Sequence, residues 1–146
     1  MLLQWSDALM IGHPIIDYDH QMLVNICNEL HHAVKFNQGD AEVKQSLGRL
    51  VQYVETHFRR EEALFMDSNY PHKEKHLKNH RDIESLVHGF LASFEKDPAG
   101  VDMDKLLNFL REWLVKHIGK LDKGYASYVE AAEKKHSQYN ARTGFV

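Results

Sequence analysis

Histidine and carboxylate side chains recur at four-residue spacings within residues 57–80, HFRREEALFMDSNYPHKEKHLKNH. His57 and Glu61 form one pair, and His76 and His80 form another. Residues four apart on an α-helix lie about 40° from each other around the axis and one turn apart, so each pair points in a single direction. Imidazoles and a carboxylate that converge on one point are suitable ligands for a transition metal. Two such pairs can also arise by chance, so their position in the fold decides between these interpretations.

Four long segments with helical periodicity must position these pairs, and no segment has a convincing strand pattern. The turn DSNYP ends the second segment, because Pro71 cannot continue a helix but suits the first turn of the next one. Asp17 is the expected N-cap of the first segment. The predicted helices span 17–36, 40–66, 71–95 and a segment that begins near 102 and continues past 128.

Short connections make consecutive helices antiparallel neighbours. The fold expected is therefore all-α, an up-down-up-down antiparallel four-helix bundle with an N-terminal arm and a C-terminal helical extension or tail. We expect the arm to cover residues 1–16, the bundle 17–132 and the tail 133–146. In this topology the start of the first helix, the end of the second, the start of the third and the end of the fourth lie together.

The candidate ligands fall at this shared end of the bundle. At a rise of about 1.5 Å per residue, six of them lie within roughly 15 Å of it: His20, His57, Glu61, His76, His80 and His117. Asp122 adds a carboxylate, but five residues after His117 is about 140° around an ideal helix. Both side chains can face inward only if the helix widens between them, near Gly119. The sequence therefore predicts a π-helical irregularity across 117–122.

Composition excludes several other classes of function. The 146 residues suffice for one domain with a substantial core, and the net charge of −3 with a pI of about 6.4 does not indicate nucleic acid or an anionic membrane as partner. No run approaches the roughly 18 apolar residues of a membrane span, and the N-terminus lacks the pattern of a signal peptide. The single cysteine, Cys27, fits a reducing compartment, so a cytoplasmic location is expected.

Seven short pieces of the sequence, in this order and at these intervals, resemble the hemerythrin family, specifically the single-domain bacterial hemerythrins or bacteriohemerythrins. They are Trp5, Gly12, IDYDH at 16–20, HFRREE at 57–62, YP at 70–71, HLKNH at 76–80 and HIGKLD at 117–122. The resemblance implies a non-haem di-iron site bridged by an oxo or hydroxo group. It places His76, His80 and His117 on one iron, His20 and His57 on the other, and Glu61 and Asp122 between them.

The resemblance further implies reversible binding of dioxygen, as carrier, store or sensor; such a protein is not an enzyme, although its site is compatible with a secondary redox activity. A reductase that donates electrons or an oxygen-consuming enzyme is the protein partner that such a role suggests. Tyr125 is expected to contact the ligands from outside. The residues expected to form the apolar oxygen pocket are Leu23, Phe58, Trp113, Leu114 and Ile118.

Two alternatives use the same ligands. One is a redox enzyme that acts on nitric oxide or peroxide at the di-iron site, and the other is a regulatory module that responds to iron or oxygen. Oxygen-activating bundles use two Glu-x-x-His motifs. Glu29–His32 and Glu133–His136 match that string, but we interpret the former as facing outward and the latter as part of the tail. The smaller number of carboxylates favours reversible binding.

The remaining polar residues are assigned more modest roles. His72 cannot join His80 on one metal, because the two are about 12 Å apart along a helix, so it is expected in solvent. His31 shares the inward stripe and is expected to be a hydrogen-bonded or partly solvated core residue, and Cys27 a small buried hydrophobe. Asp19 is expected near an imidazole ligand, which it would make more basic. The histidines expected at the surface are His13, His32, His88 and His136.

Overall fold

The computed structural model describes residues 1–143, with side chains described except at 120–121 and 138–143. Within this range the secondary structure is entirely helical. Short 3₁₀ turns cover Asp7–Leu9 and Pro98–Gly100, and a π-helix covers His117–Asp122. The α-helices are α1 (Pro14–Lys35), α2 (Asp40–Met66), α3 (Lys73–Lys96), α4 (Met103–Lys116) and α5 (Lys123–Thr143).

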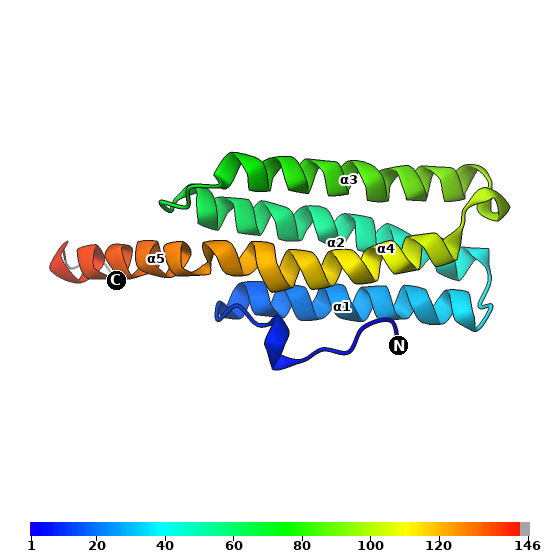
Figure 1. Ribbon diagram of the computed structural model, residues 1–146, viewed down its shortest axis with the longest axis horizontal. Helices are drawn as coiled ribbons and strands as arrows, with labels where there is room; N and C mark the ends of the chain where they lie inside the picture. Colours follow the sequence, from blue (N-terminus) through cyan, green and yellow to red (C-terminus); the bar gives the residue numbers. More distant parts are fainter. Residues whose placement is uncertain (144–146) are drawn as a thin grey trace.

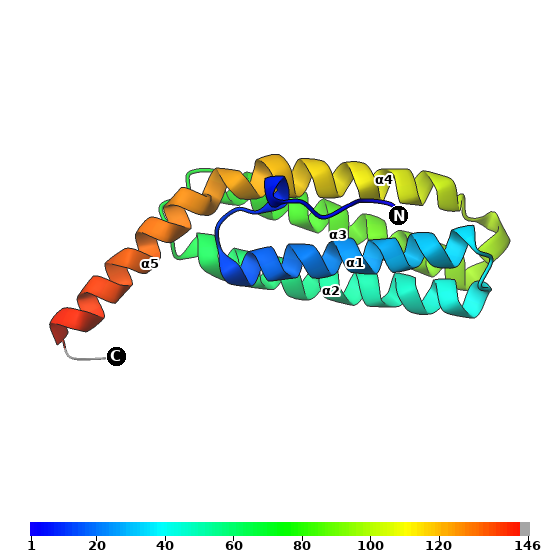
Figure 2. The ribbon, with the colours of Figure 1, turned by 90° about the horizontal axis from the view of Figure 1, so that it is seen from below.

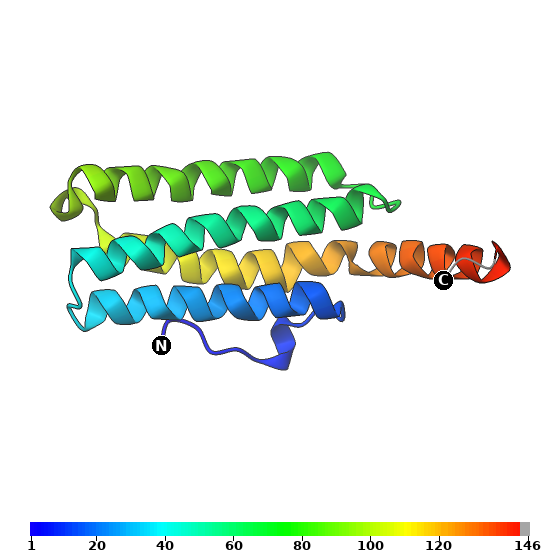
Figure 3. The same ribbon diagram turned by 180° about the vertical axis from the view of Figure 1, so that it is seen from behind.

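Helices α1 to α4 run side by side with alternating directions (Figures 1 and 3). This arrangement confirms the predicted four-helix bundle. The fourth rod continues through the π-helix into α5, which leaves the bundle at an angle and projects beyond it (Figure 2). Residues 133–143, assigned to an extension or tail, are therefore the outer part of α5, and residues 144–146 lie outside the described residues.

The start of the first helix was predicted incorrectly. Helix α1 begins at Pro14 rather than near Asp17, because His13 is its N-cap and its imidazole accepts a hydrogen bond from the Ile16 amide. Asp17 instead accepts hydrogen bonds from the backbone amides of Ile11 and Gly12, at 2.7 and 3.1 Å. The carboxylate that was expected to cap the helix therefore holds the end of the arm.

The N-terminal arm lies along α1 on the side of α4 (Figure 2). The Asn28 side chain binds it at both polar atoms: its oxygen accepts from the amides of Leu2 and Leu3, and its nitrogen donates to the Leu3 carbonyl. Lys123 holds the other half of the arm by donating to the Ala8 carbonyl at 2.8 Å. Among the described residues, no helix combines the length and the apolar character that crossing a membrane requires.

Two apolar clusters fill the bundle. The larger one extends along all four helices and contains Cys27, which is fully buried; this burial raises the pKa of its thiol to about 12. The smaller cluster lies at the end where α5 begins and consists of Phe65, Tyr70, Tyr125 and Val129. The candidate ligands lie between these clusters, so apolar side chains enclose them from both directions.

The π-helix at His117–Asp122 confirms the predicted irregularity. It widens the fourth rod by one residue, which allows both of its end residues to face the interior: His117 is 1 % exposed and Asp122 is fully buried. A regular helix would turn one of these two side chains away from the bundle.

Candidate metal centre

The structure brings the seven candidate ligands together in two groups. The first contains the side chains of Glu61, His76, His80, His117 and Asp122, and the second those of His20, His57, Glu61 and Asp122. In each group, one donor atom per residue lies within 4.8 Å of the others. Both carboxylates belong to both groups, so the two groups share an edge.

Both shared carboxylates lie near imidazoles of both groups. Asp122 Oδ2 lies 2.7 Å from Nε2 of His20, whereas Oδ1 lies 3.2 Å from Nε2 of His76 and 3.1 Å from that of His117. Glu61 is divided less strictly. Its Oε2 lies 3.7–3.8 Å from Nε2 of His76 and His80, whereas Oε1 contacts Nε2 of His57 and also lies 3.5 Å from that of His117. Carboxylates in this orientation can bridge two cations.

The donor atoms of this cluster are buried and lack well-aligned hydrogen bonds. These atoms are Nε2 of His20, His57, His76, His80 and His117 and both carboxylate oxygens of Glu61 and Asp122. Unsatisfied buried polar atoms cost about 1–3 kcal/mol each, and more when charged, so one site rarely collects so many without a ligand. Nitrogen and carboxylate donors that converge in this way fit a pair of divalent metal ions.

Asp19 fixes the orientation of the His57 ring. Its carboxylate lies 3.0 Å from Nδ1 of His57, and since an ionised carboxylate only accepts hydrogen bonds, Nδ1 carries the hydrogen and Nε2 faces the cluster. Arg60 donates two hydrogen bonds to Asp19, at 2.6 and 2.7 Å, and Tyr53 donates a third at 2.9 Å. Burial raises the pKa of Asp19, but the hydrogen bonds from His57 and Arg60 outweigh it and hold that pKa well below its usual range.

Glu62 plays the same part for His80. Its carboxylate lies 2.7 Å from Nδ1 of His80 and also accepts hydrogen bonds from Arg59 and Arg81. Sequence reasoning missed this role. One signal in the sequence could have indicated it: Glu62 is next to the ligand Glu61, just as Asp19 is next to the ligand His20. Neighbouring residues on a helix point about 100° apart, so an acidic residue beside a ligand can face a ligand on the neighbouring helix.

Aromatic rings pack directly on the imidazoles. Phe58 is fully buried and stacks on His80, with ring centroids 3.8 Å apart and planes 1° from parallel. Tyr125 stacks on His76 at 5.6 Å, and the hydroxyl of Tyr70 lies 3.5 Å from Nδ1 of the same imidazole. These contacts restrict the rotation of the rings that carry the donor atoms.

The expected pocket residues lie in the larger apolar cluster: Leu23, Phe58, Trp113, Leu114 and Ile118. All five are buried, and Phe58 and Trp113 lie against His117, with ring centroids 5.4 and 5.6 Å away. Their role as walls of an oxygen pocket stays a prediction.

The other histidines lie outside both groups. His72 is exposed at the N-cap of α3, and His31 is half-buried, with a pKa lowered by burial and by nearby positive charge. His32, His88 and His136 are exposed as expected. The expectation of a surface position was wrong for His13, whose side chain is only 14 % exposed and pairs with Glu133.

A family model described as the hemerythrin HHE cation-binding domain matches residues 12–129, which include all seven candidate ligands. The chain belongs to the hemerythrin family. A bacteriohemerythrin of Stenotrophomonas maltophilia is 34 % identical over 131 residues, which cover 89 % of this chain and 83 % of that protein. A bacteriohemerythrin of Methylococcus capsulatus is 29 % identical over 132 residues, which cover 89 % and 98 %.

A solved structure of a wild-type hemerythrin has the same fold. It superposes with a TM-score of 0.80 at 27 % identity, over 88 % of this chain and 98 % of the other. The hemerythrin family model ends at residue 129, so the outer part of α5, including Glu133, lies beyond the matched segment.

The negative charges of the buried carboxylates favour cations inside the cluster. Burial lowers the pKa of His57, but the charge of Glu61 and the hydrogen bond to Asp19 outweigh it and raise that pKa to about 10. The pKa of Glu61 is shifted in the opposite direction. Burial raises it, but His57 and the neighbouring imidazoles lower it well below its usual range. In the metal-free protein, the negative charge of the buried carboxylates therefore keeps a nearby imidazole protonated.

Metal binding must displace the proton on His57, so metal affinity should rise with pH. The raised pKa means that this proton stabilises the metal-free fold fully below about pH 6.5 and progressively less as pH approaches 10. Affinity for Fe²⁺ should therefore increase by about tenfold per pH unit for each proton displaced. Anaerobic titrations between pH 6 and pH 9 measure this slope, and an affinity independent of pH would contradict the assignment of His57 as a ligand.

Replacing Asp19 should weaken metal binding without removing a ligand. Asp19→Asn keeps an acceptor for Nδ1 of His57 but removes the charge that makes the imidazole basic and that balances Arg60. Loss of such a partner typically costs 10–100-fold in metal affinity, so a loss of about tenfold is expected. A chelator competition assay measures it, with Asp104→Asn at the surface as the matched control, and equal affinities for the two variants would refute this role.

Proposed function

We propose that this protein reversibly binds dioxygen at a non-haem di-iron site. His76, His80 and His117 would hold one iron, His20 and His57 the other, and Glu61 and Asp122 would bridge them. The observation that carries the proposal is the uneven division of the imidazoles about the two shared carboxylates, three on one side and two on the other. A metal ion on the side with fewer donors would have one protein ligand fewer, which leaves a coordination position for an exogenous ligand.

Membership in the hemerythrin family and the chemistry of the donor set support iron. Imidazole nitrogen and carboxylate oxygen suit Fe²⁺ and Fe³⁺, and a structural zinc site would instead use a closed set of four ligands. An iron pair bound there would supply the two electrons that reversible dioxygen binding requires.

The protein's own residues keep that chemistry reversible by holding the site rigid and dry. Asp19 and Glu62 fix the tautomers of His57 and His80, so the donor nitrogens need no reorganisation. Phe58, Leu114 and Ile118 are fully buried and exclude water from the interior beside the site. A neutral ligand enters such an environment at a lower desolvation cost than a charged one.

Visible spectroscopy under controlled gas tests the proposal. The iron-loaded protein is reduced anaerobically, exposed to dioxygen, and returned to vacuum. A charge-transfer band that appears with dioxygen and disappears under vacuum is the expected result. Irreversible conversion to a ferric spectrum would reject reversible binding in favour of a redox enzyme on nitric oxide or peroxide, or an iron- or oxygen-responsive module.

Two histidine variants form a matched pair for this test. His57→Ala removes one of two imidazoles from the side with fewer donors and should abolish the reversible band. His72→Ala removes an exposed imidazole only one turn before His76 and should leave iron content and the band unchanged. Loss of iron in His72→Ala would show that the assignment of ligands on α3 is wrong.

A further inference from the structure

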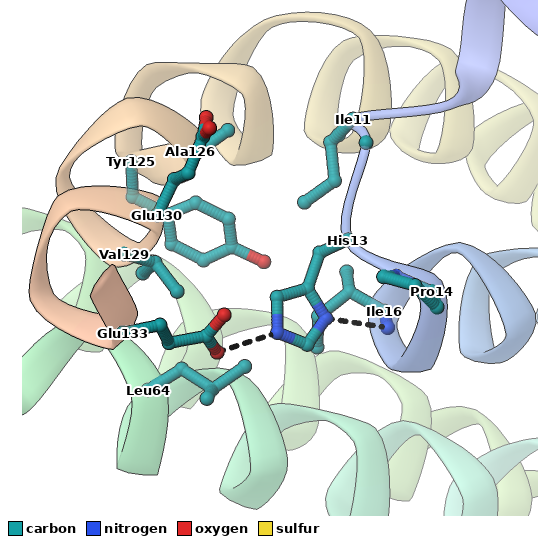
Figure 4. A pocket seen from close by; sticks show the side chains of 11 residues that line it. Ile11, His13, Pro14, Ile16, Leu64, Tyr125, Ala126, Val129, Glu130 and Glu133 are labelled. Carbon is teal, nitrogen blue, oxygen red and sulfur yellow. Dashed lines mark hydrogen bonds and ion pairs between the residues drawn. The ribbon is translucent and has the colours of Figure 1, made fainter. Parts of the chain in front are cut away.

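A cavity of about 110 Å³ lies beside the metal centre, between the end of the arm, the start of α1 and the inner face of α5. One water needs roughly 10–15 Å³ by the same measure, so the space holds several small molecules. Figure 4 shows its walls. The apolar part of the lining consists of Ile11, Pro14, Ile16, Leu64, Ala126 and Val129.

The hydroxyl of Tyr125 is the polar group on the inner side of this cavity. The residue is 1 % exposed, its hydroxyl has no hydrogen-bond partner among the described residues, and Figure 4 shows it pointing into the space beside Ile11 and His13. The same ring stacks on His76. A phenol hydroxyl is protonated at neutral pH, so it can donate a hydrogen bond to a molecule in the cavity. The Tyr125 ring therefore contacts the cavity and the His76 imidazole at once.

A hydrogen bond closes the outer side: Nδ1 of His13 accepts from the Ile16 amide, so Nε2 carries the hydrogen and donates it to Glu133. Nε2 of His13, at the start of α1, lies 2.8 Å from a carboxylate oxygen of Glu133 on α5. The Glu133 side chain is 51 % exposed and reaches His13 across the mouth of the cavity (Figure 4). Because the Glu133 side chain is half exposed and solvent screens its contact with His13, this closure can open readily.

The charges around the cavity discriminate against anions. Glu130 and Glu133 line its outer part, and the carboxylate of Asp17 binds the backbone amides of Ile11 and Gly12 in its wall. The lining residues include no lysine or arginine, and the His13 imidazole accepts the Ile16 amide at Nδ1 and is therefore neutral. An anion that enters meets this negative field within apolar walls, where charge is poorly screened. A small uncharged molecule that accepts a hydrogen bond meets no such barrier.

We infer that this cavity is an antechamber that binds small neutral hydrogen-bonding molecules of the size of hydrogen peroxide and excludes anions. Its outer closure is the His13–Glu133 pair, and its inner hydrogen-bond donor is Tyr125. That the antechamber serves the iron site rests on the function proposed above, whereas the binding and its selectivity for uncharged molecules are properties of these residues alone.

Thiol modification tests the selectivity without any contribution from iron. Val129→Cys places a thiol in the cavity wall, and Ser127→Cys places one on the exposed face of the same helix as the matched control. Cys27 should not react with either reagent, because its thiol is buried and has a raised pKa. Neutral iodoacetamide and anionic iodoacetate have similar sizes, and each forms a carbon–sulfur bond with the thiolate while iodide leaves.

The rate of alkylation by iodoacetamide, divided by the rate of alkylation by iodoacetate, should be about tenfold larger for Val129→Cys than for Ser127→Cys. Adding Glu133→Ala, which removes the closing side chain from a surface position, should raise the rate with iodoacetamide several-fold and lower the ratio. Equal ratios for the two thiols, no reaction at Val129→Cys with either reagent, or no effect of Glu133→Ala would each overturn the inference.

A second measurement tests the connection to the metal. Iron-loaded Val129→Cys that has been alkylated by iodoacetamide has a filled antechamber, and its reduced form should be oxidised by hydrogen peroxide several-fold more slowly than alkylated Ser127→Cys. Equal rates would overturn the connection. A failure of the proposed function is separate and visible beforehand, because it appears as low iron content or an irreversible spectrum, while the thiol rates remain measurable.

Discussion

Removal of the metal should lower the melting temperature of the protein by roughly 10 °C. A ligand that binds only the folded state at about 1,000 times its dissociation constant contributes about 4 kcal/mol, and each kcal/mol corresponds to about 2–4 °C for a chain of this length. The source is the buried cluster itself. Without cations, the donor atoms of Glu61 and Asp122 stay buried without well-aligned hydrogen bonds.

Differential scanning calorimetry of the loaded protein, before and after anaerobic treatment with a ferrous-iron chelator, measures this loss. Adding Fe²⁺ back should restore the higher melting temperature, which separates metal loss from damage to the chain. An unchanged melting temperature in the metal-free protein would mean that the cluster is satisfied without cations, contrary to its geometry.

Glu61→Gln should abolish the dinuclear site while leaving the metal-free fold intact. Glu61 is fully buried at the end of α2 and is a member of both ligand groups, so its loss of charge affects both metals at once. We expect iron content to fall from two per chain to well below one. The amide has nearly the same volume as the carboxylate, so the core remains filled.

Glu55→Gln is the matched control, because Glu55 lies on the same helix but pairs with His88 at the surface. It should keep two irons per chain. Elemental analysis gives the iron content, and the melting temperature of each metal-free variant reports folding. Two irons per chain in Glu61→Gln would contradict the bridging role. If the metal-free variant failed to fold, the loss of iron would instead be a result of misfolding.

The bundle follows from local signals that the sequence displays directly. The period of apolar residues, Pro71 after the second helix and Asp102 before the fourth set the helix boundaries within one or two residues of those observed, and Asp102 caps α4 through its side chain. The error at Asp17 has a physical cause. A carboxylate that can cap a helix can equally bind the preceding loop, and the position of the arm decides between them.

The convergence of the candidate ligands was predictable because five of them lie on α-helices, whose period is known, and the interval from His117 to Asp122 required the π-helix that the structure shows. The contacts behind them were not, because they depend on which neighbouring helix a side chain meets. Glu62 appears in the sequence as one more charge on an exposed face, and only the packing of α2 against α3 brings it to His80. The His13–Glu133 pair joins residues 120 positions apart, which no local pattern indicates.

Anomalous diffraction at the iron edge, from crystals of the loaded protein, is the most direct measurement of the dinuclear site. Two peaks are predicted, both in contact with Glu61 and Asp122. One peak should also lie against His76, His80 and His117, and the other against His20 and His57. A single peak between the carboxylates, or peaks away from these side chains, would contradict the proposed di-iron site.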